Sequence, residues 1–168
     1  MPQPATCRLL LSELCAFVKE TVAAYPFPSP DGPVQDCRVF LHGLPEEQDA
    51  GTWPFIVCRF VDGEVTSEAD SKTVLKDTVA LILGVHSPVS QEQAGLLLAE
   101  LLDLLRAALW RKRLLAGRFE LEEPLRARVA DMEQKVHKFH LATLETTWNY
   151  VWPPKAQAEF THFAHATA

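Results

Sequence analysis

The chain lacks the sequence signatures of several common kinds of active site. Its 168 residues contain no Gly-rich phosphate-binding loop, no nucleophile elbow and no helical HExxH motif. The four cysteines, Cys7, Cys15, Cys37 and Cys58, form no CxxC pair and no Cys/His cluster. We therefore expect no metal and no cofactor, and we assign no catalytic residue. The cysteines are expected to stay reduced and to serve mainly as small core residues.

A basic excess and a long apolar run are missing as well. The formal net charge is −6. This argues against a general nucleic-acid-binding protein, which displaces counterions from phosphate with a basic surface, but it leaves open a protein past which DNA slides. Residues 1–25 show no basic segment followed by a cleavage site, and no apolar run is long enough to cross a membrane. We expect a cytosolic protein that does not use a membrane.

One long segment, residues 87–117, stands out. It reads SPVSQEQAGLLLAELLDLLRAALWRKRLLAG and predicts an amphipathic helix of about seven turns. Ser90 is a suitable N-cap, and Gln93 three residues later completes a capping-box pattern. The basic residues 111–113 suit the negative end of the helix dipole, and Gly117 is expected to stop the helix.

This helix has an apolar face and an opposite polar stripe. The apolar face consists of Ala94, Leu97, Leu98, Leu101, Leu102, Leu104, Leu105, Ala108 and Leu109. On the polar stripe we single out Glu100, Asp103, Arg106 and Trp110 as candidates for an oligomer or partner interface. The tryptophan is out of place there: either another part of the chain covers it, or it anchors a partner protein.

The remaining elements are shorter. Residues 6–24, capped by Thr6, predict a second helix. Alternating apolar and polar residues predict strands at 37–42, 53–61, 71–86, 118–121, 125–129 and 138–152. Asp62-Gly63 is a strong turn signal, and residues 64–70 are a candidate for a wide hairpin end. The Pro-rich residues 25–33 are either a connector or a docking arm.

These elements indicate an α+β fold. We expect a mainly antiparallel sheet, with one long amphipathic helix and an N-terminal helix packed on it. The second half of strand 71–86 is apolar on both faces, which predicts a central position in the sheet. Residues 1–153 are expected to form a single domain, and residues 154–168 a mobile polar tail.

Few titratable residues suggest chemistry. Asp77 interrupts an apolar strand, so it is either a buried carboxylate with a shifted pKa or the place where the strand leaves the core. His137 and His140 are three residues apart at a strand start, which places them on opposite faces and makes a shared metal ion unfavourable. His162 and His165 lie in the expected tail.

The order of the parts resembles that of a known family. The phrases WPFIVCRFVDGEV, TVALILGVHS, the helical LLDLLRAAL, GRFELEEPL and TLETTWNYVWP follow one another within residues 6–153. This succession resembles the tail terminators, the small tail-completion proteins of long-tailed bacteriophages. Before the TTW phrase the chain reads EQKVHKFHLA, where the family carries a turn rich in Pro, Tyr and Gly.

The resemblance implies a virion structural protein of the phage tail or neck, assembled in the host cytoplasm. Such a subunit forms a homo-oligomeric ring, typically a hexamer, which caps the tail tube, ends its polymerisation and offers an attachment surface to the head. The implied partners are the tail tube protein and the head–tail connector proteins. DNA passes the channel only as cargo, and no catalysis is involved. A head-to-tail ring needs two different surfaces on each subunit.

Two other functions stay open. A cytosolic α+β adaptor module would recognise a protein partner through the Leu-rich helix, residues 25–33 and Trp110. A small hydrolase or transferase would use Asp77 together with a histidine such as His86. The adaptor predicts a stable monomer, whereas the enzyme requires a pocket that joins its two side chains.

Overall fold

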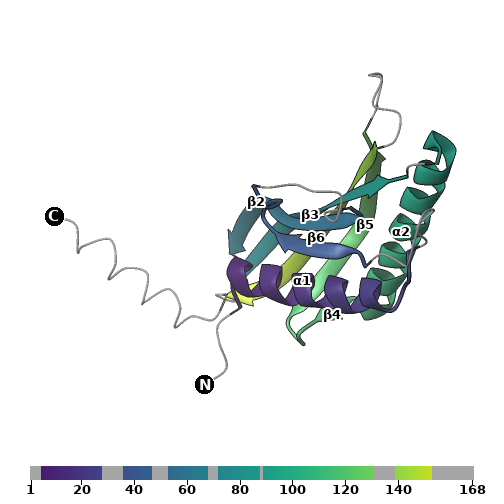
Figure 1. Ribbon diagram of the computed structural model, residues 1–168. Helices are drawn as coiled ribbons and strands as arrows, with labels where there is room; N and C mark the ends of the chain where they lie inside the picture. Colours follow the sequence, from purple (N-terminus) through teal and green to yellow (C-terminus); the bar gives the residue numbers. More distant parts are fainter. Residues whose placement is uncertain are drawn as a thin grey trace.

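A computed structural model describes residues 5–27, 36–46, 53–67, 72–87, 89–130 and 139–152. These residues form two helices and six strands (Figure 1). In chain order they are α1 (Cys7–Ala23), β1 (Arg38–Leu41), β2 (Phe55–Ser67), β3 (Thr73–His86), α2 (Gln91–Lys112), β4 (Leu114–Leu115), β5 (Phe119–Val129) and β6 (Phe139–Trp152). The expected tail, His137 and most of the Pro-rich segment lie outside the described residues.

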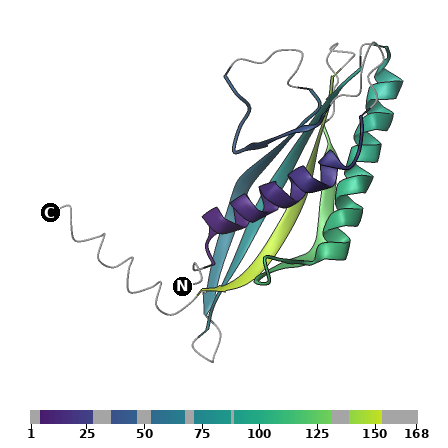
Figure 2. The same ribbon diagram turned by 60° about the horizontal axis from the view of Figure 1, so that its bottom comes forward.

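The six strands form one sheet in the order β1-β2-β3-β6-β5-β4. The α+β prediction is confirmed, and β3 is central, as its apolar second half predicted. Every described strand pair is antiparallel except β1 with β2, which is parallel, so the sheet is mixed. In Figure 2, α1 crosses the strands and α2 runs roughly along them.

Both helices pack on the same face of the sheet. Alternate residues of β6 point toward them and are buried: Ala142, Leu144, Thr146, Trp148 and Tyr150. All residues of the apolar face predicted for α2 are buried, apart from the half-buried Leu104 and Ala108. The core therefore lies between two helices and one sheet face, and the opposite sheet face carries no described helix.

The predicted N-caps of both helices are confirmed. Thr6 Oγ1 accepts a hydrogen bond from Leu9 N at 3.2 Å, and Ser90 Oγ accepts one from Gln93 N at 3.1 Å. The Gln93 side chain differs from the capping-box prediction, because its Oε1 accepts a hydrogen bond from Ser87 Oγ at 2.9 Å. The start of α2 is thus tied to the end of β3.

The turn predicted at Asp62-Gly63 is wrong. β2 runs through both residues to Ser67, and its register against β3 shifts between Phe60 and Asp62. Gly63 faces the buried Asp77, and a Cβ on Gly63 would lie 2.4 Å from Asp77 Oδ1. The glycine therefore makes room for a carboxylate on the neighbouring strand, a long-range reason that a local turn signal does not reveal.

Two other boundaries differ from the sequence prediction. α2 ends at Lys112, five residues before Gly117, because the backbone turns at Arg113, which has a φ of 44°. Leu114–Leu115 then leave the helix direction to pair with Phe119 and Glu120. The two stretches split by Pro124 are one strand, β5, whose register against β6 shifts between Glu122 and Arg126.

The buried Thr146 hydroxyl gives a first testable prediction. Its Oγ1 donates to the Val79 carbonyl and accepts from Trp148 Nε1, each at 2.9 Å. We expect Thr146→Val to destabilise the fold by about 1–3 kcal/mol, because it leaves the buried indole N–H without an acceptor. Urea unfolding measures this, with Thr147→Val, half-buried on the other face, as the control. Equal stability of both variants would contradict the assignment.

Candidate functional site

An open hollow lies between the C-terminal half of α2 and the edge of β5. We call it the trough. Its volume is about 570 Å³, and its lining is Arg106, Ala107, Trp110, Arg111, Glu123, Pro124 and Leu125. The irregular residues of β5 form one wall, and the polar stripe of α2 forms the other. An aromatic ring, a proline and two guanidinium groups therefore surround one open cavity.

Two of the four interface candidates line the trough. They are Arg106 and Trp110, and the indole is 48% exposed. Asp103 lies outside the lining and forms an exposed ion pair with Arg106, with 3.4 Å between Oδ1 and Nη1. Glu100 is engaged elsewhere, because its Oε2 accepts a hydrogen bond from Tyr25 Oη at 2.5 Å, which raises the pKa of the tyrosine. Their role as an interface stays a prediction.

Arg113 fixes the position of Trp110 and of the facing strand. Its guanidinium carbon lies 4.4 Å from the centroid of the Trp110 ring, in cation–π geometry. The same guanidinium forms an ion pair with Glu123, next to Pro124. The side chain that follows the end of α2 therefore links the two walls of the trough. Trp110 remains 48% exposed where it lines the cavity, although the Arg113 guanidinium lies over its ring.

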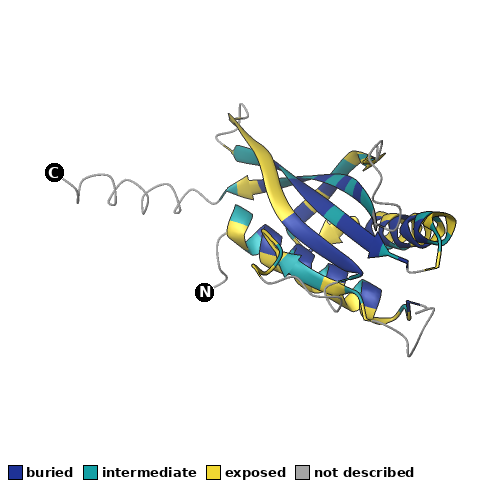
Figure 3. Cartoon of the chain, turned by 45° about the horizontal axis from the view of Figure 1, so that its top comes forward, coloured by how far each residue is buried: buried dark blue, intermediate teal, exposed yellow. Residues whose placement is uncertain are grey.

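A second exposed surface lies along β2, on the other side of the central β3–β6 pair from β5. Residues 59–67 of β2, which we call the β2 arm, are all exposed, whereas residues 55–58 are buried. Figure 3 shows this change along the strand, from dark blue to yellow. β1 pairs only with residues 55–58, so within the described residues the arm has a strand partner on the β3 side alone. Val61 is 52% exposed and Val65 is 62% exposed.

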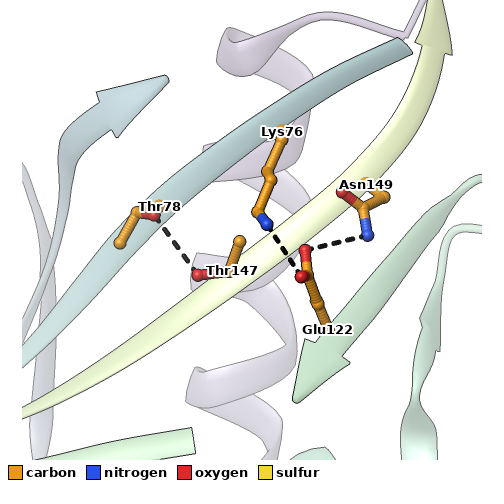
Figure 4. A network of polar contacts seen from close by, with 5 residues as sticks. All are labelled: Lys76, Thr78, Glu122, Thr147 and Asn149. Atoms are coloured by element: carbon orange, nitrogen blue, oxygen red, sulfur yellow. Dashed lines mark hydrogen bonds and ion pairs between the residues drawn. The ribbon is translucent and has the colours of Figure 1, made fainter. Parts of the chain in front are cut away.

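A polar network crosses the open face of the sheet between these two surfaces (Figure 4). Lys76 Nζ on β3 donates to Glu122 Oε1 on β5 at 2.7 Å, and Asn149 Nδ2 on β6 donates to Glu122 Oε2 at 3.1 Å. The hydroxyls of Thr78 and Thr147 are 3.3 Å apart. Glu122 therefore ties three strands together on the face opposite the helices.

On the helix face, Asp77 is buried at 5% exposure. Its Oδ2 accepts a hydrogen bond from Tyr150 Oη at 2.5 Å. Burial, and then the hydrogen bond to Asp77, raises the pKa of Tyr150. Burial and the nearby Asp77 also raise the pKa of the Cys7 thiol to about 11. The carboxylate therefore links β3 to β6 inside the core, which resolves the sequence alternatives in favour of a buried group.

The hypothetical catalytic pair of Asp77 and His86 is not brought together. The two residues are nine positions apart on β3, which corresponds to about 30 Å in an extended strand. They also point to opposite faces, because an odd separation along a strand reverses the side-chain direction. His140 and the other described His, Cys, Asp and Glu residues form no group of three or more that could hold a metal ion.

The cysteines behave differently from reactive thiols. Cys15 and Cys58 are buried, and Cys7 and Cys37 are half-buried. Burial raises the pKa of Cys37 to about 12, and it also raises the pKa of Cys58. The thiols of Cys37 and Cys58 are therefore protonated at neutral pH and are poor nucleophiles. Neither described helix combines the length and the apolar character needed to cross a membrane.

Comparison with models of known protein families and with curated protein sequences gave no match. The assignment of function therefore depends on the surfaces described above. Sequence reasoning found Arg106 and Trp110, because they break or border the amphipathic pattern of α2. It missed Arg111 as a trough residue, the wall from Glu123 to Leu125, and the β2 arm. The sequence held one signal for the arm, the valines Val61 and Val65 beside the acidic Asp62 and Glu64. The structure shows that both valines are exposed.

The Glu122 network gives a prediction about pH. The hydrogen bond from Lys76 lowers the pKa of Glu122 below its ordinary value of 4.5. A lowered carboxyl pKa stabilises the fold above the unfolded-state pKa, and this stabilisation is lost as the pH falls through the folded-state pKa. We expect Glu122→Gln to cost at most about 1 kcal/mol at neutral pH, as for other partly exposed ion pairs.

The measurement is the free energy of unfolding in urea from neutral to acidic pH. The difference between the wild type and Glu122→Gln should shrink as the pH falls below 4.5. The nearby Glu120→Gln, at an exposed position, is the control and should show a smaller difference. A constant difference at every pH would show that the ion pair with Lys76 does not stabilise the fold.

Proposed function

We propose that this chain is a tail-terminator-like ring subunit of a long-tailed phage or prophage. Its role is to cap the tail tube, to end tube polymerisation and to provide the surface on which the head-neck proteins attach. In this role the chain performs no catalytic step, and DNA passes the ring only as cargo. The partners are further copies of the chain, the tail tube protein and the head–tail connector proteins.

The observation that carries this proposal is a pair of unlike open edges on one sheet. The β2 arm has a described strand partner on one side only, and beyond Leu121 β5 pairs only with β6 among the described residues. A head-to-tail contact joins two different surfaces and generates a ring when the rotation closes. Exposed strand edges are suited to pairing with another chain. Two such surfaces on opposite sides of the sheet meet this requirement.

Composition and the order of the elements support the same role. The net charge of −6 disfavours adhesion of DNA to a channel wall, because like charges repel. The sequence phrases that resemble the tail terminators fall on β2, β3, α2, β5 and β6, which together build nearly the whole sheet and the long helix. The resemblance thus concerns the elements that create the two edges.

The proposal is tested with the tail tube protein encoded in the same genome. Tubes are assembled with and without this chain and imaged in negative stain. We expect a ring at one end of each tube and shorter tubes, because the ring blocks further addition of subunits. Tubes of unchanged length without terminal rings would overturn the proposal.

The exposed Trp110 keeps a second function in consideration, that of a cytosolic adaptor. An aromatic ring in an open trough is a common anchor for a partner protein. This reading differs from the ring in its oligomeric state, because an adaptor remains a monomer and binds an unlike partner. The adaptor function does not account for the two open sheet edges, so we rank it second.

Trp110→Ala provides a prediction for the ring. We expect the variant to fold, because the indole is 48% exposed, and to weaken self-assembly by roughly tenfold or more. Leu96→Ala is a matched control, since Leu96 is 60% exposed on the same helix outside the trough. Sedimentation velocity at several concentrations measures the effect. An unchanged oligomer in Trp110→Ala would exclude the trough from the ring contact.

A further inference from the structure

We infer that the β2 arm of one copy occupies the trough of the next copy, with Asp62 and Glu64 facing Arg106 and Arg111. This inference rests on the proposed ring and goes further by stating which two surfaces meet. The occupant is a second copy of this chain.

The two surfaces have complementary charge. Asp62 and Glu64 lie on the exposed arm, and no described residue forms an ion pair with either of them. In the trough, Arg111 also has no described ion-pair partner, and Arg106 has only the exposed contact with Asp103. The acidic Glu123 is already neutralised by Arg113. The trough therefore offers two cations to a segment that brings two carboxylates.

The two surfaces also match in their apolar groups. On the arm, Val61 and Val65 are more than half exposed and flank the two carboxylates. In the trough, Trp110 is half exposed, and the half-buried Leu125 lies on the opposite wall. A valine against the exposed part of the indole, or against Leu125, buries apolar area on both partners that is in contact with water in the free monomer.

The arm and the trough lie at the same level of the sheet. Asp62 is paired with Thr78, Thr78 with Thr147, and Thr147 with Glu122, so one row of residues crosses four strands. Glu123, the next residue, lines the trough. The row spans three strand spacings, about 14 Å. If the rotation axis of the ring runs along the strands, two contact surfaces at the same level along that axis add each subunit without a shift along it, and the ring closes. Surfaces at different levels would shift each subunit along the axis and give an open filament.

The wall of the trough favours contact through side chains. β5 is irregular between Glu122 and Arg126 and contains Pro124, and a proline and an irregular register both interrupt a hydrogen-bond ladder at an edge. Continuous strand pairing is therefore unsuited to this part of the edge. Specificity then depends on the charged pairs and on the Trp110 anchor, so that charge reversal is a sharp test.

The experiment uses two charge-reversed variants of the full chain. The arm variant is Asp62→Lys/Glu64→Lys, and the trough variant is Arg106→Glu/Arg111→Glu. Alone, each variant places like charges at every contact, and we expect its self-assembly to fall by roughly tenfold or more. An equimolar mixture pairs each reversed surface with a complementary one, so we expect it to regain the wild-type mass in light scattering, with the two chains in equal amounts.

A control matched to the trough variant changes the net charge by the same amount elsewhere. Arg8→Glu/Lys19→Glu reverses two exposed cations on α1, outside the trough, and should assemble like the wild type. Far-UV circular dichroism checks that all variants fold. We expect them to fold, because the six exchanged side chains are all exposed. If a double variant unfolds, Glu64→Lys and Arg111→Glu carry the same comparison.

The outcomes separate this inference from the proposed function. If the wild type forms rings and both charge-reversed variants also form them alone, the arm does not enter the trough, and the ring function is unaffected. If folded variants stay monomeric alone and in the mixture, the contact between arm and trough is likewise excluded. If the wild type forms no ring, alone or on tubes, the proposed function fails and this inference fails with it.

Discussion

The pairing of β3 with β6 is the constraint on which the rest of the structure depends. The two strands align over their whole length, from Thr73 opposite Trp152 to His86 opposite Phe139. Their shared inner face holds Trp148, the largest fully buried side chain, and the Asp77–Tyr150 hydrogen bond. β2 adds to one side of this pair and β5 to the other. Because β2 and β5 are both attached to this pair, a slip of one residue between β3 and β6 would exchange the inner and outer faces of half the sheet.

This central pair also determines how the two candidate surfaces are related. The β2 arm lies one strand from β3, and the trough wall lies one strand from β6. The ion pair between Lys76 and Glu122 spans β6 and joins the strand beside the arm to the strand beside the trough. The two surfaces are therefore parts of one sheet connected on both faces, by the core on one side and by this polar network on the other. A subunit of a closed ring needs such a fixed relation, because the angle between its two contacts decides whether the ring closes.

Local patterns predicted much of this fold. Thr6 and Ser90 as caps, the Leu-rich face of α2 and the alternation along β6 each depend on residues that are close in sequence, and the structure confirms them. The misplaced boundaries depend on distant partners. Gly63 is needed beside Asp77 on β3, and Arg113 turns the chain where Glu123 and Trp110 hold its side chain. For the same reason sequence supplied Arg106 and Trp110 but not the opposite wall of the trough, since only the folded chain brings residues 123–125 to α2.

The central claim is that each subunit uses both unlike surfaces at once in a closed ring. Native mass spectrometry of the wild-type chain over a wide range of concentration tests this most directly. The expected result is one dominant oligomer whose mass is a single multiple of the 18.8 kDa subunit and does not grow with concentration. A closed ring leaves no free arm and no empty trough, so addition stops. A continuous ladder of sizes, or a strict monomer at every concentration that also forms no ring on tail tubes, would contradict the account.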